Sequence, residues 1–249
     1  MLTISVLGSS SSGNCYLVQS PETKEILILD AGVPFKEIQQ AVKFDFKNVS
    51  GVLITHEHED HIKSTEKIAR CGIDIYASNG TFMSKNLIGY RYHVVKSLQE
   101  LQIGNFKVLP FSTQHDAAEP LGFLIEYIPT KERILYATDT FYLKYKFKNI
   151  NYFLLECNYI QEIAKKNVEL GIVDRTRYKR LLKSHMSLKN CIDFLKNNVS
   201  SNTRKIVLIH LSNENSNEKI MIDEIKNTFG IDTVVANKNM NIDLKKYLF

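Results

Sequence analysis

Three histidines and an aspartate lie within six residues of one another. They are His56, His58, Asp60 and His61. Imidazole nitrogens and carboxylate oxygens are the usual protein ligands of zinc and of divalent metals of similar character. The segment follows an apolar run at 51–55 with strand character, so we expect a turn in which a rigid strand holds these side chains in place. Because the whole chain has only seven histidines, this cluster predicts a metal site rather than a polar surface turn.

Further candidate ligands follow other strand-like segments. His115 lies in a turn-like stretch after 106–111, Asp139 comes after 134–137, and His210 ends a run that begins at Lys205. A lone histidine at a strand end is more often structural than a ligand, but a metal site that still lacks ligands favours the second interpretation. Two metal ions that share one set of donors need about six or seven ligands. The seven candidates are His56, His58, Asp60, His61, His115, Asp139 and His210.

The elements that must position these residues change in type along the chain. Strand-like runs occur at 3–7, 15–18, 25–29, 51–55, 106–111, 123–128, 134–137, 152–156 and 205–210, and helical periodicity occurs at 35–42, 62–70, 160–170, 188–197 and 218–229. Early hairpins followed by strand–helix units are typical of an α/β (α+β) fold in which helices cover sheets. No repeat, low-complexity tract or Pro/Gly linker divides residues 1–249, so we expect a single domain.

Composition narrows the class of protein. An apolar share of 44% is ample for a buried core. The longest apolar runs have strand length, far below the roughly 20 residues that a bilayer demands, so a membrane protein is not expected. The four cysteines are scattered without paired spacing, and the first residues lack a charged leader. We therefore expect reduced thiols and a cytoplasmic location.

The net charge of +5 is mild, so any contact with nucleic acid must come from local clusters. One is 141–148, where lysines alternate with aromatic residues that include Tyr142, and the other comprises Arg175, Arg177, Lys179, Arg180 and Lys183. Aromatic rings can stack on bases while lysine balances phosphate charge, so Tyr142 is a candidate for substrate binding. Two other interpretations stay open: the alternating apolar residues of 141–148 form a buried face, and both clusters are solvated surface.

A serine-rich loop at 9–13 provides further candidates for substrate binding. Ser11, Ser12 and Asn14 offer polar groups that could approach a phosphate. The loop lacks the lysine and the following helix of a P-loop, so a simple turn into the next strand explains it equally well.

The arrangement of histidines and aspartates resembles the metallo-β-lactamase superfamily. Its His-x-His-x-Asp-His signature is matched at 56–61, and its later single ligands are matched by His115, Asp139 and His210. The resemblance implies a four-layer αββα sandwich and two metal ions, with zinc as the default and manganese as the alternative. It implies that one ion is held by His56, His58 and His115, the other by Asp60, His61 and His210, and that Asp139 bridges them. β-Lactamases usually lack a histidine at 61 and flavodiiron proteins carry glutamate at 58, so both groups are disfavoured.

Within this superfamily the chain resembles the branch that hydrolyses phosphodiesters. Residues 7–14, 115–120 and 137–140 look like those of the YycJ/WalJ-type exonucleases and, more distantly, of ribonuclease Z. The Ser-His-Met-Ser stretch around His185 resembles the motif that ribonuclease Z enzymes place near the scissile phosphate, and Glu156 resembles the acid that accompanies it. We expect His185 at the N-terminus of a helix, where backbone N–H groups favour anions. The alternative is that His185 only neighbours a helix cap.

These residues together predict a phosphodiesterase that depends on two metal ions. The ions would activate water and clamp the phosphate, Asp60 would orient or deprotonate that water, and His185 would protonate the leaving oxygen with Glu156 beside it. The main expectation is a nuclease acting at DNA or RNA ends, and resemblance to ribonuclease Z implies a homodimer. The alternative is a phosphodiesterase for cyclic nucleotides, similar to the anti-Pycsar enzymes. A thioester or lactone hydrolase and a metal-binding protein without activity are less favoured, because neither explains His185 with Glu156.

Overall fold

A computed structural model describes residues 2–244, and these residues form two compact units. Unit 1 comprises residues 2–112, 117–132 and 237–244. Unit 2 comprises residues 113–116 and 133–236.

Unit 1 contains a seven-stranded mixed sheet with the strand order β14-β1-β2-β3-β4-β5-β6. Its strands are β1 (Thr3–Ser10), β2 (Gly13–Gln19), β3 (Ile26–Leu29), β4 (Val49–Leu53), β5 (Ile75–Ala77), β6 (Tyr92–Val94) and β14 (Asn241–Asp243). Pairing is antiparallel from β14 to β3 and parallel from β3 to β6. Because β3 and β4 are parallel and Leu29 lies opposite Leu53, the residues that follow these two strands leave the sheet at the same edge.

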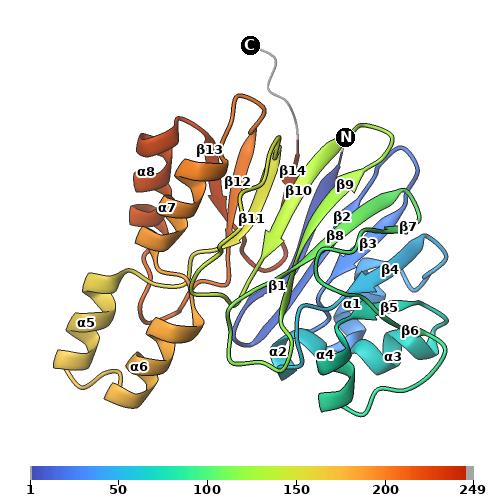
Figure 1. The fold of residues 1–249 in the computed structure, drawn as a ribbon, viewed down its shortest axis with the longest axis horizontal. Coiled ribbons are helices and arrows are strands. Elements are labelled where there is room, and N and C mark those ends of the chain that lie inside the picture. The colour runs from blue at the N-terminus through green and yellow to red at the C-terminus, as the bar shows by residue number, and fades with distance from the viewer. Residues whose placement is uncertain (1, 245–249) are drawn as a thin grey trace. The chain divides into compact units, whose positions relative to one another are not determined.

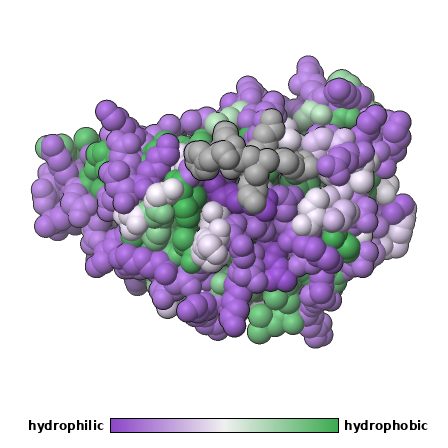
Figure 2. Space-filling model, turned by 90° about the horizontal axis from the view of Figure 1, so that it is seen from above, coloured by the Kyte–Doolittle hydropathy of each residue, from purple (hydrophilic) through white to green (hydrophobic). Residues whose placement is uncertain are grey.

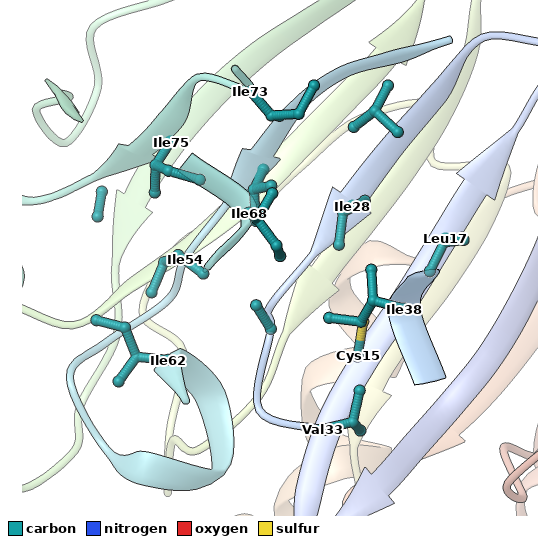
Figure 3. Close-up of a cluster of buried hydrophobic side chains, with 14 of the residues drawn as sticks. Cys15, Leu17, Ile28, Val33, Ile38, Ile54, Ile62, Ile68, Ile73 and Ile75 are labelled. Carbon is teal, nitrogen blue, oxygen red and sulfur yellow. The ribbon is translucent and has the colours of Figure 1, made fainter. Parts of the chain in front are cut away.

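Helices bury the apolar face of this sheet. They are α1 (Phe35–Ala41), α2 (Glu59–Ile62), α3 (Thr65–Arg70) and α4 (Asn79–Ser84). Figure 3 shows Ile38 of α1 and Ile68 of α3 close to Cys15 and Ile28 of the sheet, and all four side chains are fully buried. Burial of one such isoleucine is worth about 1.5–3 kcal/mol. The core therefore fixes β3, β4 and the short α2 that follows them.

Unit 1 also contains three antiparallel strands. They are β7 (Leu101–Ile103), β8 (Phe106–Ser112) and β9 (Leu121–Tyr127). Phe106 lies opposite Tyr127, both are buried, and the Tyr127 hydroxyl donates a hydrogen bond of 3.0 Å to Ser20 Oγ. A buried tyrosine needs such a partner for its hydroxyl group, so this contact ties β9 to the loop after β2.

Unit 2 is built on parallel strands. They pair in the order β10 (Glu132–Ala137), β11 (Tyr152–Glu156), β12 (Lys205–Ile209) and β13 (Asp232–Val235). Every residue of β11 and β12 is buried, as expected for parallel strands covered on both faces. Ala137 lies opposite Leu155 and Glu156 opposite Ile209, so the carboxyl ends of β10, β11 and β12 meet at one edge.

Four helices complete unit 2. They are α5 (Gln161–Glu169), α6 (Arg175–Ser184), α7 (Leu188–Asn198) and α8 (Glu218–Phe229). In Figure 1, α7 and α8 lie beside β12 and β13, whereas α5 and α6 form a separate helical pair. On the face drawn in Figure 2 hydrophilic residues predominate and hydrophobic ones form small separate patches. Within residues 2–244 no helix is both long and apolar enough to span a bilayer.

Some elements differ from the sequence-based expectations. The predicted helix at 62–70 is two helices, α2 and α3, because the chain turns at Ser64, whose backbone N–H donates to the Ala31 carbonyl oxygen at 2.9 Å. The strand predicted at 51–55 ends two residues earlier, at Leu53. Helix α6 was not predicted, because five of its ten residues are charged and it lacks a continuous apolar stripe.

Candidate metal centre

The candidate metal ligands of unit 1 follow strand β4, as predicted. His56 and His58 lie in the loop between β4 and α2, and Asp60 and His61 lie in α2. His56 Nε2 is 3.0 Å from His58 Nδ1. Two nitrogens bound to one ion at about 2.1 Å, with angles near 90–109°, are about 3.0–3.4 Å apart. The spacing of these two imidazoles therefore fits ligands of a single cation.

His61 is oriented by Asp30, a residue that the sequence analysis did not single out. The His61 ring is buried, and its Nδ1 lies 2.8 Å from Asp30 Oδ2. The Thr55 backbone N–H donates to Asp30 Oδ1 at 2.8 Å, and the Thr55 hydroxyl lies 3.0 Å from each carboxylate oxygen. A histidine that donates its Nδ1 proton to a carboxylate keeps the Nε2 lone pair for a metal. Asp30 thus sets the tautomer that metal binding requires.

The segment after β3 also fixes the position of α2. The Ala31 backbone N–H donates to the His61 carbonyl oxygen at 2.7 Å. A Cβ atom added to Gly32 would lie 1.7 Å from the Asp60 carbonyl oxygen. Since no side chain fits there, glycine at position 32 lets two backbone segments approach closely and holds Asp60 and His61 against the end of β3.

The three candidates for substrate binding near the first hairpin lie in two different environments. Ser11 and Ser12 form the exposed turn between β1 and β2. Asn14 is fully buried in β2, and its Nδ2 lies 3.0 Å from His61 Nε2 and 3.4 Å from Asp60 Oδ2. Asn14 therefore lies among the candidate metal ligands of unit 1, whereas the two serines lie at the surface.

The donors of unit 2 collect at the carboxyl ends of its parallel strands. Asp139 follows β10, Glu156 ends β11 and His210 follows β12. His185 joins them, and the ligand atoms of these four residues lie within 4.8 Å of one another. Because neighbouring parallel strands end at the same edge, such side chains converge without a long loop.

Asp139 is shared between two histidines. Its Oδ1 lies 3.1 Å from His210 Nδ1, and its Oδ2 lies 3.5 Å from His115 Nε2. His115 Nδ1 lies 3.0 Å from the Ser184 carbonyl oxygen, so this nitrogen carries the proton and Nε2 is left as an acceptor. A carboxylate whose two oxygens face different imidazoles is arranged as a bridging ligand would be.

The partly buried His185 forms an ion pair with the fully buried Glu156. His185 Nδ1 lies 2.7 Å from Glu156 Oε1. The other oxygen of Glu156 accepts the backbone N–H groups of Thr140 at 2.8 Å and Met186 at 3.2 Å. Burial alone would raise the pKa of Glu156 and lower that of His185, but the attraction between them prevails, so the pKa of Glu156 is lowered and that of His185 is raised. The imidazole therefore holds its proton to higher pH than a free histidine does.

His185 does not lie at a helix N-terminus, which corrects the sequence-based expectation. It is the C-terminal cap of α6. The next helix, α7, begins after Ser187, whose side chain accepts the Asn190 N–H. Met186 N–H is bonded to Glu156. His185 is thus held by a carboxylate, not by the dipole of a helix start.

Tyr142 and its neighbours show an alternating pattern. Tyr142 is half exposed, whereas Leu143 and Phe147 are buried. The Thr140 hydroxyl donates to the Tyr142 carbonyl oxygen at 2.8 Å, which fixes this chain segment next to Asp139. The apolar members of 141–148 therefore form a buried face, and Tyr142 and the lysines point to the surface.

Three residues of these clusters have left-handed backbone conformations. Asp30 and His210 directly follow a strand, Asp139 lies two residues after one, and their φ values are 57°, 56° and 46° respectively. This region costs a residue with a Cβ atom about 1–2 kcal/mol, although aspartate and histidine occupy it more readily than most. At each of these positions the left-handed backbone turns the side chain out of the strand, toward candidate ligands of the same unit.

Comparison with known proteins agrees with this geometry. Residues 27–211 match the family described as Beta-lactamase superfamily domain. Exodeoxyribonuclease YycJ of Bacillus anthracis is 29% identical over 234 residues, which cover 88% of this chain and 86% of that protein. Exodeoxyribonuclease WalJ of Streptococcus pneumoniae is 26% identical over 261 residues, which cover 98% and 92%. The metallo-β-lactamase fold protein YhfI of Bacillus subtilis superposes with a TM-score of 0.74 at 17% identity, over 96% of this chain and 98% of that one.

The chain is a member of the β-lactamase superfamily, and the predicted metallo-β-lactamase fold, with mixed sheets flanked by helices, is confirmed. Its relatives support the prediction of a metal-dependent hydrolase. The family match includes segments of both compact units, and the expected single domain stays a prediction.

Proposed function

We propose that this protein is a phosphodiesterase that uses two divalent metal ions and acts as a nuclease at DNA or RNA ends. The observation that carries the proposal is the pair of contacts made by Asp139, whose two oxygens face His115 and His210. A carboxylate in that position suits two neighbouring cations, and paired cations suit the hydrolysis of a phosphodiester.

The donors are numerous enough for two ions. Unit 1 offers His56, His58, Asp60 and His61, and unit 2 offers His115, Asp139 and His210. We assign His56, His58 and His115 to one ion, Asp60, His61 and His210 to the other, and Asp139 to both. Imidazole and carboxylate donors suit zinc, with manganese as the alternative. When bound, such ions polarise the phosphoryl group and increase the acidity of water.

The protein's own groups perform the remaining chemistry. The leaving oxygen needs a proton, and His185 is suited to donate one because Glu156 raises its pKa. Glu156 is a positioning residue, held in turn by two backbone N–H groups. Asp60, next to His61 in α2, is proposed to orient the attacking water or to accept its proton.

The relatives favour a nuclease over a cyclic-nucleotide phosphodiesterase. Two relatives that align with most of this chain are named as exodeoxyribonucleases. The proposed substrate contacts remain Ser11, Ser12, Asn14 and Tyr142. Of these, Asn14 contacts the candidate metal ligand His61. The predicted homodimer and cytoplasmic location also stay predictions.

One experiment separates the metal-binding role from the proton-donating role. His185→Ala should keep both metals and lose most of its turnover of bis-(p-nitrophenyl) phosphate, about 10²–10⁴-fold for a general acid. Asp139→Ala should lose metal as well. His93→Ala is the matched control, because His93 is the one histidine outside the candidate set and pairs with Asp74 at 3.2 Å.

Metal content by mass spectrometry and hydrolysis rates would be measured on the same samples. Full activity of His185→Ala would remove that residue from the mechanism. Linear DNA, linear RNA and cyclic nucleotides would then be compared side by side. Hydrolysis of the cyclic substrates alone would refute a nuclease.

A further inference from the structure

Positive charge is concentrated on one helix of unit 2. Helix α6 contains five basic residues and no acidic one. This number equals the net charge of the whole chain, +5, so the rest of the sequence carries 27 basic and 27 acidic residues. Because positive and negative charges balance in the rest of the sequence, the positive potential is expected to be local to α6 and not spread over the whole surface.

The basic residues of α6 divide into two groups. Arg177 pairs with Glu214 at 3.3 Å, and Arg180 pairs with Asp116 at 2.8 Å. Arg175, Lys179 and Lys183 are exposed, and within residues 2–244 none of these three has an acidic partner at ion-pair distance. Two of the basic side chains thus pair with acidic residues elsewhere in unit 2, and the other three are available to bind a ligand.

The three available cations lie on one side of the helix. They are spaced four residues apart, so each is turned by only about 40° from the one before and the row is about 12 Å long. On the opposite side of α6 lie Leu181, which is partly buried, and the paired Arg177. We call Arg175, Lys179 and Lys183 the α6 stripe.

The C-terminal end of the stripe adjoins the candidate metal centre. Lys183 is two residues from His185, a separation of at most about 7 Å along the chain. The Ser184 carbonyl oxygen accepts from His115, and the Ser184 hydroxyl donates to Asp116 at 3.2 Å. The last turn of α6 is therefore fixed to the donors of unit 2, and the stripe leads away from them.

We propose that the α6 stripe binds the sugar-phosphate backbone of a nucleic-acid strand whose end lies at the metal centre. This inference rests on the proposed function and extends it, because it assigns the substrate to polymers. A cyclic mononucleotide has one phosphate and cannot occupy a 12 Å row of cations in addition to the reaction site. A polyanionic strand gains affinity from each cation through the release of its counterions.

An anionic membrane is the competing ligand, since Leu170 and Ile172 are exposed in the connection before α6. We favour nucleic acid because the stripe begins beside the groups that would act on a phosphodiester. The test therefore includes vesicles of phosphatidylcholine and phosphatidylglycerol.

The test variant is Arg175→Gln/Lys179→Gln/Lys183→Gln, in which glutamine preserves helix propensity. The matched control is Lys67→Gln/Lys219→Gln/Lys226→Gln, which removes the same charge from exposed sites on α3 and α8. Binding of the metal-loaded proteins to a single-stranded DNA protected by terminal phosphorothioates is measured by fluorescence anisotropy as a function of salt. Hydrolysis of bis-(p-nitrophenyl) phosphate is measured in parallel.

A plot of the logarithm of the binding constant against the logarithm of the salt concentration has a negative slope. For the stripe variant this slope should be shallower by about 2, since each phosphate contact on a single strand contributes about 0.7. That change corresponds to about 100-fold weaker binding at ~0.1 M salt. The control should keep the wild-type slope, and both variants should keep wild-type turnover of the small substrate.

Equal losses in the two variants, or no loss in the stripe variant, would overturn the proposal. Loss of vesicle binding with DNA binding unchanged would overturn it in favour of a membrane. Failure of the wild type to hydrolyse any phosphodiester would refute the proposed function, whereas the comparison of salt slopes would still report on the stripe.

Discussion

Replacement of Asp30 by asparagine tests whether a carboxylate outside the ligand set controls metal binding. The Asp30 carboxylate receives the Thr55 backbone N–H on one oxygen and faces His61 Nδ1, at 2.8 Å, with the other. Asparagine has nearly the same shape but only one oxygen acceptor. One possibility is that the amide N–H₂ group faces the Thr55 N–H, so that two donors oppose each other. The other is that it faces His61 and drives that ring to the tautomer with the proton on Nε2, which leaves Nε2 without a lone pair for a metal.

The expected effect of Asp30→Asn is a 10–100-fold loss of metal affinity, as is usual for a partner that orients a ligating histidine. This loss corresponds to about 1.4–2.8 kcal/mol. Affinity would be measured by competition with a chromophoric zinc chelator, and metal content by mass spectrometry. Asp74→Asn is the control, because Asp74 pairs with Arg91 at 3.0 Å and is outside the candidate set; it should leave metal affinity unchanged.

A double-mutant cycle makes this test specific to His61. If Asp30 acts through His61, then Asp30→Asn should add little further loss of affinity in a His61→Ala background. Thermal unfolding in the presence of a chelator separates a general loss of stability from a loss of metal binding. An unchanged affinity in the single variant, or an equal loss in both backgrounds, would refute the reasoning.

Two further predictions concern the backbone at Gly32 and the ion pair between His185 and Glu156. Gly32→Ala should destabilise the protein by about 1–3 kcal/mol and weaken metal binding, because the new methyl group must displace the Asp60 carbonyl; an unchanged melting temperature would contradict this. In metal-free protein, the His185–Glu156 pair should add most to stability between pH 4.5 and 6.5, the ordinary pKa values of the two groups. Its contribution should be lost as pH rises through the raised pKa of His185 and as pH falls through the lowered pKa of Glu156. Urea unfolding of wild type and Glu156→Gln across pH checks this, and a difference that grows at alkaline pH would contradict it.

The parts of the site that are local in sequence could be predicted from sequence. The cluster from His56 to His61 is a short segment after an apolar strand. Asp139 follows a strand with a recognisable apolar run, and Glu156 ends another. Asp30 could not be found this way. Its role depends on the parallel pairing of β3 with β4, which brings it to His61 from 31 residues away. The only signal in the sequence was an acidic residue directly after an apolar strand-like run.

The environment of His185 was predicted only in part. Its pairing with Glu156 followed from the motif, but its place at the end of α6 did not, because α6 lacks the apolar periodicity that indicates a helix. Asp174 stabilises the start of this helix by accepting the backbone N–H groups of Thr176 and Arg177. Strands β5 and β6, with three residues each, are too short for a pattern of alternation to identify them.

The left-handed backbone at Asp30, Asp139 and His210 has a consequence for attempts to engineer this protein. A search for more stable sequences would favour glycine at these positions, because glycine relieves the conformational penalty of each turn. Every such substitution would also delete a proposed metal ligand or the carboxylate that orients one. Selection for stability alone would therefore remove the proposed metal centre first, and a library meant to improve the scaffold needs these three positions held constant.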